Sequence, residues 1–414
     1  MRVQARRRQF PLVRRCVFSP RFPLGAVAWY SRPVQQDLKN LTREELIAEI
    51  AKLGEPAYRV DQILSWIYPQ RAASITAMSN LSKGLREKLA ANYSFTTLEL
   101  VRKQGSHDTT QKFLWKLSHG QLVESVLIPA SLALYGERAD RHTLCVSTQV
   151  GCAYGCKFCA SGLDGWKRNL TAAEIVDQVL AVERHSGIQQ LQAVLQSSPS
   201  HDSGTQALKH PGTSSRLINN IVFMGMGEPF ANYDNLMRAI RIITAPWGCG
   251  IGARKITVST SGLVPQIQKF ADEPQQIRLA ISLHGATDEV RLKIMPVNRR
   301  WPLKELLAAC DYYAKHKQRM ITFEYILIEG VNDGLDQAEK LAAIAKRLNA
   351  KVNLIPYNTV EGLAWKRPSE HQCETFYKTV RRHGATVTLR IEKGHDIDAA
   401  CGQLRLKTER EPGG

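Results

Sequence analysis

The sequence contains no run that approaches about 18 consecutive apolar residues, the shortest length that crosses a bilayer as a helix. The apolar stretch near its start is interrupted by Arg14, Arg15 and Arg21, so we predict no transmembrane segment and no membrane partner. Hydrophobic residues make up 43% of the chain and charged residues 23%, a balance typical of globular proteins. A length of 414 residues allows a sizeable core and more than one domain.

Acidic residues are in short supply. The chain has 38 Asp and Glu against 56 Lys and Arg, a net charge of +18, which favours nucleic acid as a partner because basic side chains that bind phosphates release counterions. Residues 1–36 hold eight arginines, no lysine and no acidic residue, so they supply +8 and leave +10 for the rest. We interpret them as a basic leader or disordered tail, which implies the cytoplasm, or as a transit segment, which implies an organellar matrix or stroma.

Cysteines are few and unevenly spread. Nine cysteines do not form the even framework of a secreted disulfide-rich protein, so a reducing compartment is expected. Four of them lie in "TLCVSTQVGCAYGCKFCASG", residues 143–162. Cys310 and Cys373 are interpreted as helix-packing residues, Cys249 has no motif around it, and Cys16 belongs to the leader.

Residues 37–94 show apolar residues at helical spacing, and "NLTREELIAEIAKLG" opens with a Thr cap and a Glu pair. We predict a small helical domain there, either a packing appendage or an RNA-binding accessory domain. Residues 95–142 contain the alternating runs "TTLELVRKQ", "TTQKFLWKL" and "QLVESVLIPA" separated by turn residues. They predict a short antiparallel β patch that links the helical domain to the remainder.

Residues 143–392 repeat strand-like and helical stretches six times, from "TLCVSTQV" to "KVNLIPYN". This pattern predicts an α/β fold, a partial (βα)6 barrel with chemistry at the carboxyl ends of its strands. Residues 186–216, rich in Ser, Gln, Gly and His, are expected to form a surface insertion without an assigned role. Residues 393–414 form a C-terminal loop and tail, which carries Cys401 in the polar segment "DIDAACGQL".

Cys152, Cys156 and Cys159 follow the first predicted barrel strand at the spacing C-x-x-x-C-x-x-C. Three thiolates at that spacing suit one iron–sulfur cluster and leave one of four irons open. An open iron can bind the amino and carboxylate groups of S-adenosylmethionine and reduce its sulfonium, which yields a 5′-deoxyadenosyl radical. The alternatives are a structural zinc site completed by Cys145 or a set of buried thiols, and zinc ranks second because it usually takes two separated pairs.

The cysteine spacing, with Phe158 before the last cysteine, resembles the radical S-adenosylmethionine superfamily. "LCVSTQVGC", "GMGEP", "STSG", "AISLH", "NLIPYN" and "DIDAACGQL" together resemble the RlmN-type dual-specificity RNA methyltransferases over residues from about Leu38 to Leu404. The resemblance implies methylation of the C2 carbon of an adenine in 23S rRNA and of an adenine next to the anticodon of tRNA. The sister Cfr-type enzymes methylate C8, and the motifs separate the two poorly.

The resemblance also implies roles for single residues. A [4Fe-4S] cluster would be held by Cys152, Cys156 and Cys159, and two S-adenosylmethionine molecules per turnover would be bound by a set of residues at strand ends: Gly227, Glu228, Ser259, Ser282, Leu283, His284 and Asn358. Cys401 would take a methyl group as S-methylcysteine. Cys145 would resolve the protein–RNA intermediate and leave a disulfide bond with Cys401. Glu124 is a candidate proton acceptor, although it could equally be a solvated carboxylate, and Cys145 could take the proton instead.

The C2 carbon of adenine lies between two ring nitrogens and is not a nucleophile, so the implied methylation needs a radical route. RNA contacts are expected from basic clusters beside aromatic residues, namely Trp166-Lys167-Arg168, Arg299-Arg300-Trp301 and Arg381-Arg382. The target adenine would have to leave its stack. We further expect a monomer and an electron donor such as a flavodoxin-type protein. Two other hypotheses stay open: a radical enzyme acting on a peptide or metabolite, and a zinc-stabilised RNA-binding protein.

Overall fold

An N-terminal helical region is present, as predicted, in the structure, a computed structural model that describes residues 35–107, 109–130, 141–197, 216–390 and 402–411. Its helices are α1 (Arg43–Lys52), α2 (Tyr58–Ile67) and α3 (Lys83–Asn92). Thr42 caps α1 as expected, because its hydroxyl accepts the Glu45 N–H while the Glu45 carboxylate accepts the Thr42 N–H. The predicted leader, Cys401 and most of the predicted insertion lie outside the described residues.

Ten strands form one sheet in the order β1-β2-β3-β4-β7-β8-β9-β10-β11-β12. Their bounds are β1 (Glu99–Gly105), β2 (Gln111–Lys116), β3 (Leu122–Pro129), β4 (His142–Cys145), β7 (Asn220–Phe223), β8 (Ile256–Thr260), β9 (Arg278–Ser282), β10 (Thr322–Leu327), β11 (Lys351–Pro356) and β12 (Thr386–Leu389). A separate two-stranded sheet pairs β5 (Gln149–Gly151) with β6 (Trp166–Asn169).

The antiparallel strands β1, β2 and β3 continue the large sheet, because β3 pairs with β4. The predicted patch is therefore the edge of the barrel sheet and no separate layer. From β4 to β12 every neighbouring pair is parallel. β12 adds a seventh parallel strand to the six predicted, and its short, half-exposed pattern explains why the sequence did not mark it. Since β1 and β12 stand at opposite ends of the order, the barrel is partial, as expected.

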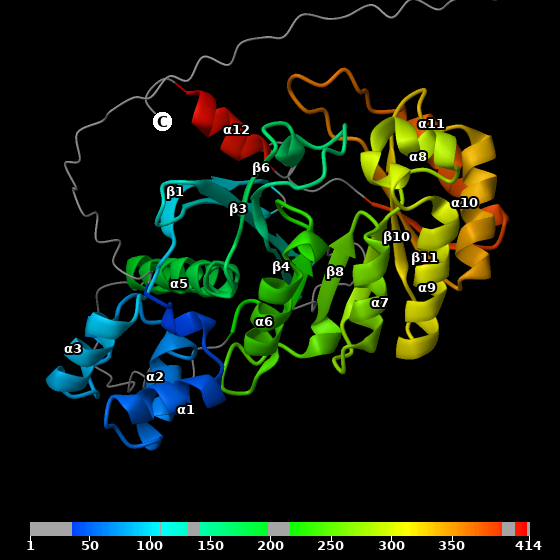
Figure 1. Ribbon diagram of the computed structural model, residues 1–414. Helices are drawn as coiled ribbons and strands as arrows, with labels where there is room; N and C mark the ends of the chain where they lie inside the picture. The colour runs from blue at the N-terminus through cyan, green and yellow to red at the C-terminus, as the bar shows by residue number, and fades with distance from the viewer. Residues whose placement is uncertain (1–34, 108, 131–140, 198–215, 391–401, 412–414) are drawn as a thin grey trace, which may run out of the picture. The chain divides into compact units, whose positions relative to one another are not determined.

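Helices connect and cover the parallel strands (Figure 1). They are α5 (Ala172–Ser197), α6 (Tyr233–Thr244), α7 (Val264–Asp272), α8 (Asp288–Ile294), α9 (Leu303–Lys317), α10 (Leu335–Arg347) and α11 (Glu370–Arg382), followed by α12 (Gln403–Arg410) near the C-terminus. Because α5 runs to Ser197, the predicted insertion begins as a continuation of this helix. No helix among the described residues is long and apolar enough to cross a membrane.

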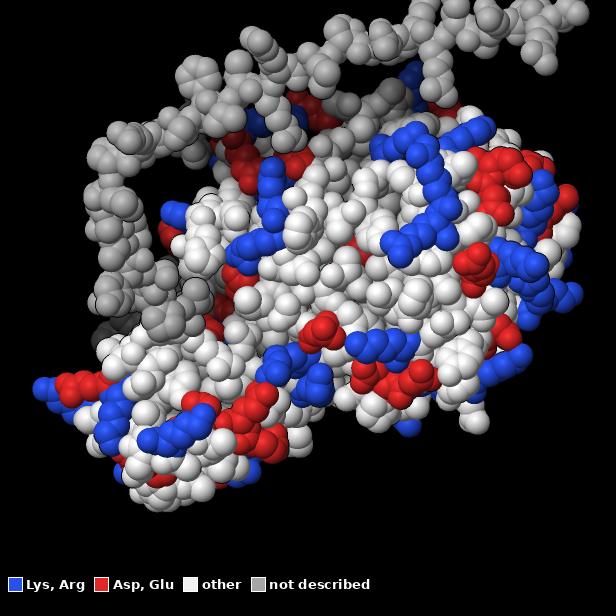
Figure 2. Space-filling model, viewed as in Figure 1, with Lys and Arg blue, Asp and Glu red and all other residues white. Residues whose placement is uncertain are grey.

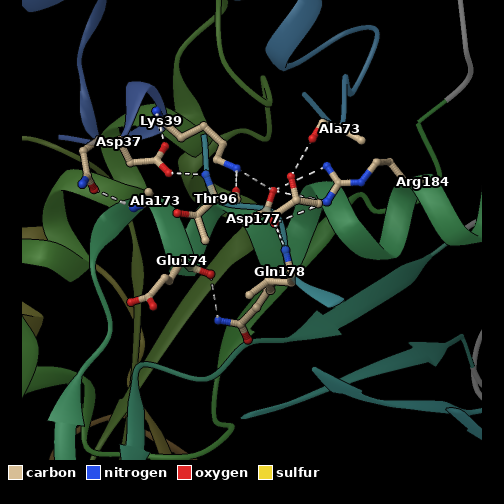
Figure 3. Close-up of polar contacts among 12 residues, drawn as sticks. Asp37, Lys39, Ala73, Thr96, Ala173, Glu174, Asp177, Gln178 and Arg184 are labelled. Atoms are coloured by element: carbon tan, nitrogen blue, oxygen red, sulfur yellow. Dashed lines mark hydrogen bonds and ion pairs between the residues drawn. The ribbon is translucent and has the colours of Figure 1, made fainter. Parts of the chain in front are cut away.

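A buried polar network joins the helical region to α5 (Figure 3). The Lys39 ammonium lies 3.1 Å from the Asp177 carboxylate, with both side chains 1% exposed, and Arg184 pairs with the same carboxylate. Burial raises the pKa of Asp177, but the two cations outweigh burial and lower it below its usual value. Asn40 accepts the Ala173 N–H at 2.7 Å, next to this pair. The network holds the helical region in a defined position on the barrel.

Candidate active site

The cysteine loop is the connection between β5 and β6. Gly151 has φ +75° and lies so close to the Gly165 carbonyl that an added Cβ would come within 2.0 Å of its oxygen. The Cys152 N–H donates to the same carbonyl at 3.3 Å. The loop neck is therefore closed by backbone contacts that only glycine permits at position 151. The three cysteines lie on the short loop that follows, and all three are half-buried.

The thiols of this loop are disfavoured as thiolates unless a metal binds. Burial raises the pKa of Cys152 to about 12, and repulsion by Cys159 adds to the rise. Burial likewise raises the pKa of Cys156. No group of three or more Cys, His, Asp or Glu in the described part of the chain is arranged to hold a single metal ion. Cysteines that bind an iron–sulfur cluster each bind a different iron, so they need not converge on one point. Three soft sulfur donors on one half-buried loop therefore fit a cluster better than a single metal ion.

Gln149 connects the cysteine loop to the "GMGEP" loop, residues 225–229. Its Oε1 accepts the N–H groups of Ala153, at 3.1 Å, and Glu228, at 2.9 Å. Gly227, at φ +99°, lies against Gln149, and an added Cβ would meet the Gln149 side chain at 2.6 Å. Gln149 was not identified from the sequence. Its position three residues before Cys152 is the only signal that could have marked it.

The Glu228 carboxylate is buried and binds two backbone N–H groups, that of Phe230 at 3.0 Å and that of Ser261 at 2.7 Å. Burial raises the pKa of Glu228, while these hydrogen bonds oppose the rise. Ser261 belongs to "STSG", residues 259–262, at the end of β8. The predicted second and third strand-end loops are thus directly joined through the Glu228 carboxylate.

Ser259 and Ser282 end neighbouring strands, and their hydroxyls lie 3.4 Å apart. The next residues are Leu283, which is fully buried, and His284, at φ +55° in the left-handed region. His284 Nδ1 accepts the Ile326 N–H at 3.1 Å, which places the proton of the neutral ring on Nε2. Burial lowers the pKa of His284 to about 3, so the ring is neutral at physiological pH.

The His284 ring packs edge-on against Phe158 of the cysteine loop, with ring centroids 4.9 Å apart. This contact joins the fourth strand end to the cysteine loop. Asn358 follows β11 at the same edge of the sheet and is half-buried. Within the described residues, no hydrogen bond joins the Asn358 side chain to the other candidates.

Glu124 is buried, with 2% of its surface exposed, so the alternative prediction of a solvated carboxylate is wrong. Its Oε2 lies 3.0 Å from the Lys112 ammonium and accepts the Gly402 N–H at 2.8 Å. Its Oε1 accepts the Arg405 N–H at 2.7 Å. A carboxylate at the start of a helix complements the unpaired N–H groups there. Glu124 therefore fixes the first turn of α12, which directly follows Cys401 in sequence.

Gly402 also packs against the cysteine loop. It has φ +88°, and an added Cβ would lie 2.9 Å from the Ser161 Cα and N atoms. Cys145 is buried in β4, where it is the register partner of Val126 on β3. Glu124 lies on the same strand as Val126, so Gly402 is held next to the strand pair that carries Cys145.

The predicted basic clusters differ in the solvent exposure of their side chains. Trp166 and Lys167 are exposed on β6, but Arg168 pairs with Glu174 at 2.7 Å and is a structural residue. The Arg300 guanidinium stacks over the Trp301 ring at 4.8 Å, and Arg299, Arg381 and Arg382 are exposed. On the face in Figure 2, basic side chains are interspersed with acidic and uncharged ones.

Cys310 on α9 and Cys373 on α11 are buried in the core, as predicted for helix-packing residues. Cys249 is also buried, in the segment between α6 and β8. These three cysteines do not lie among the strand-end loops described above. They offer matched controls for substitutions at the candidate site.

Comparison with known proteins gives consistent matches. The ribosomal RNA large subunit methyltransferase N-terminal domain matches residues 36–94, and the radical SAM superfamily matches residues 216–342. A probable dual-specificity RNA methyltransferase RlmN of Akkermansia muciniphila is 52% identical over 373 residues, 90% of this chain and 96% of the relative. A protein of the same description from Opitutus terrae is 53% identical over 379 residues, 92% of this chain and 96% of the relative.

A solved structure also matches most of the chain. The crystal structure of a radical SAM methyltransferase from Sphaerobacter thermophilus has a TM-score of 0.78 and 43% sequence identity. The match covers 89% of this chain and 98% of that protein.

Proposed function

Because this chain belongs to the RlmN-type family of radical SAM RNA methyltransferases, we propose that it methylates the C2 carbon of an adenine in 23S rRNA and of an adenine next to the anticodon of tRNA. The relatives are described as dual-specificity RNA methyltransferases, which supports both substrates. The C8 carbon is the competing position.

The observation that carries the proposal is the anchoring of Gly402. This residue is bonded to Cys401, donates to Glu124 on β3 and packs against Ser161, two residues after Cys159. A residue adjacent to Cys401 thus contacts both the strand beside Cys145 and the end of the cysteine loop. This arrangement supports a reaction that uses Cys401, Cys145 and the cysteine triplet at one site.

The residues that would hold the cofactors lie around one edge of the sheet. Cys152, Cys156 and Cys159 would hold the cluster, which when loaded supplies the electron that splits S-adenosylmethionine into a 5′-deoxyadenosyl radical. Glu228 would bind the ammonium group of the methionyl part through the carboxylate capacity left by its two backbone partners. The remaining strand-end residues would bind its other polar groups: Gly227, Ser259, Ser282, Leu283, His284 and Asn358.

In the proposed sequence, the Cys401 thiolate first attacks the methyl carbon of one S-adenosylmethionine, takes that methyl group onto its sulfur, and displaces S-adenosylhomocysteine as the leaving group. Both carboxylate oxygens of Glu124 already accept hydrogen bonds, which supports Cys145 over Glu124 as the acceptor of the C2 proton when the one-carbon bridge forms. Cys145 would then attack the Cys401 sulfur, break the bond between that sulfur and the bridging carbon, and return its proton to that carbon, so that the methylated base leaves and a Cys145–Cys401 disulfide remains.

RNA would bind near the cysteine loop. Trp166, 52% exposed on β6, offers a stacking face beside that loop, and the Arg300–Trp301 pair offers a second one. Because rRNA and tRNA are the proposed partners, the enzyme would work where ribosomes are made. A monomer served by a small reducing protein, such as one of the flavodoxin type, would suffice for the reaction.

The test is reconstitution without oxygen. The protein is loaded with iron and sulfide, supplied with a reductant, S-adenosylmethionine and 23S rRNA or tRNA, and the digested RNA is analysed by mass spectrometry. We expect 2-methyladenine. A product methylated at C8 would move the enzyme to the sister family, and a loaded cluster without any methyladenine would refute the proposal.

Cys145→Ala tests the resolving step. We expect this variant to accumulate a covalent protein–RNA adduct through Cys401, because the bridge cannot be opened without the second thiol. Cys373→Ala is the matched control, since it removes a buried cysteine away from the site and should turn over without an adduct. Free turnover by Cys145→Ala would show that its assigned role is wrong.

A further inference from the structure

Helix α8 carries a buried cation that no sequence motif marked. Arg291 has 0% of its surface exposed. Its Nε donates to the Asn298 side chain at 3.1 Å, and Nη1 donates to the Leu283 carbonyl at 3.0 Å and contacts the Met295 sulfur at 3.3 Å. All the hydrogen-bond acceptors of this guanidinium among the described residues are uncharged.

The carbonyl partners of Arg291 belong to the loops that end β8 and β9. Nη2 donates to Ser261, and Nη1 donates to Ser282 at 3.3 Å as well as to Leu283. Two glycines, Gly262 and Gly285, leave room for the side chain and the backbone of Arg291. An added Cβ at Gly262 would lie 3.0 Å from Nη2, and an added Cβ at Gly285 would lie 2.7 Å from the backbone nitrogen of Arg291.

The positive charge has no acidic partner in the described ranges, where no ion pair joins Arg291 to a carboxylate. The nearby Asp288 carboxylate instead accepts from Asn298 at 2.8 Å and from the Leu303 N–H at 2.8 Å. Burial lowers the pKa of Arg291 to about 10, which leaves it charged at neutral pH. A buried charge without an opposite charge lowers the stability of the folded protein. An anion that binds beside Arg291 would therefore be stabilised by its charge.

The cysteine loop is the neighbour that can become anionic. The Lys157 N–H donates to the Ile294 carbonyl at the end of α8, at 2.9 Å, which fixes the loop against the helix that carries Arg291. Three thiolates with a bound cluster carry net negative charge.

We propose that Arg291 is a positioning residue of the cofactor site, whose fixed positive charge stabilises the reduced cluster and whose hydrogen bonds hold the β8 and β9 ends in place. The inference rests on the proposed cluster site. Reduction adds one negative charge to the cluster, and a buried cation nearby favours that state more than the oxidised one. Removal of the charge therefore shifts the reduction potential to a more negative value.

The experiment compares Arg291→Gln with Arg291→Lys. Both proteins are reconstituted with iron and sulfide, their iron and sulfide contents are measured, and the midpoint potential is read by electron paramagnetic resonance during a redox titration without RNA. We expect a more negative potential in Arg291→Gln and a value near that of the unaltered protein in Arg291→Lys. A fully loaded Arg291→Gln cluster with an unshifted potential overturns the proposal.

A second pair of variants keeps the test decisive if Arg291→Gln does not fold. The double variant Asp288→Asn/Asn298→Asp places a carboxylate beside Nε of an intact Arg291 and keeps an amide opposite it at position 288, and Asp288→Asn alone is its control. We expect a more negative potential in the double variant than in Asp288→Asn, and equal potentials would overturn the proposal. Failure of the unaltered protein to load a cluster would refute the proposed function itself, which is a different result.

Discussion

At the scale of single residues, His284 couples the site to pH. Its pKa is lowered by burial from 6.5 to about 3, so between these values the unfolded chain binds a proton that the folded chain does not. The free energy of unfolding therefore falls as pH drops below 6.5, by about 1.4 kcal/mol per pH unit from this group. Buried carboxylates with raised pKa values, such as Glu228 and Glu324, act in the opposite direction.

His284→Asn isolates the contribution of the histidine. Asn tolerates the left-handed backbone at this position and can accept the Ile326 N–H with its side-chain oxygen. We expect the apoprotein's free energy of unfolding to fall by about 1.4 kcal/mol more in the unaltered protein than in the variant between about pH 7.5 and about pH 5.5. Urea unfolding followed by circular dichroism measures it, and equal losses would contradict the assignment of a buried neutral ring.

At the scale of elements, α12 depends on Glu124 for its first turn. Glu124→Gln keeps the shape of the side chain, but removes the buried ion pair with Lys112 and turns an amide donor toward backbone N–H groups. We expect a loss of about 3 kcal/mol, with faster hydrogen exchange in residues 402–411. Glu411→Gln is the control at the end of the same helix, because Glu411 is 43% exposed in its pair with Arg102, and this substitution should leave stability nearly unchanged.

The same variant separates two roles for Glu124. If the carboxylate positions the segment that carries Cys401, then Glu124→Gln slows the first methyl transfer to Cys401, which mass spectrometry of the protein detects. A residue that acted only as the base for the C2 proton would leave this transfer unchanged. Normal methylation of Cys401 together with unaltered exchange in α12 would exclude the positioning role.

At the scale of the whole molecule, the positions of the candidate residues at strand ends could be predicted where the signal was local. The cysteine triplet, Gly227 and Glu228 each follow a strand within a few residues, and Ser259 lies near the end of β8; parallel strands place such segments at one edge. Prediction from the sequence failed where partners are far apart in the chain. Glu124 meets Gly402 across 278 positions, and the surroundings of Arg291 come from three different loops. Only the folded chain reveals that these groups meet.

The Lys39–Asp177 pair, whose members lie 138 positions apart, decides how the helical region sits on the barrel. Lys39→Met would remove one of the two cations that pair with the buried Asp177 carboxylate and leave it with Arg184 and the Leu98 N–H, so we expect a loss of about 3 kcal/mol or more. Because Lys39 precedes α1 and its ion pair joins the helical region to α5, the amides of α1 to α3 should exchange faster than those of the barrel strands. Lys52→Met is the control, since Lys52 is 69% exposed in its pair with Glu49 and should change little.

The rigidity of the helical region has a consequence for RNA binding. If the helical region grips RNA, loosening it raises the entropy cost of binding, because the region must then be ordered when RNA arrives. Lys39→Met should therefore bind RNA more weakly and with unchanged cluster potential, whereas Arg291→Gln should show the reverse. Fluorescence anisotropy with a labelled RNA hairpin measures the affinity. Unchanged affinity in Lys39→Met, despite faster exchange in α1 to α3, would show that the helical region is a packing appendage and that the barrel alone holds the RNA.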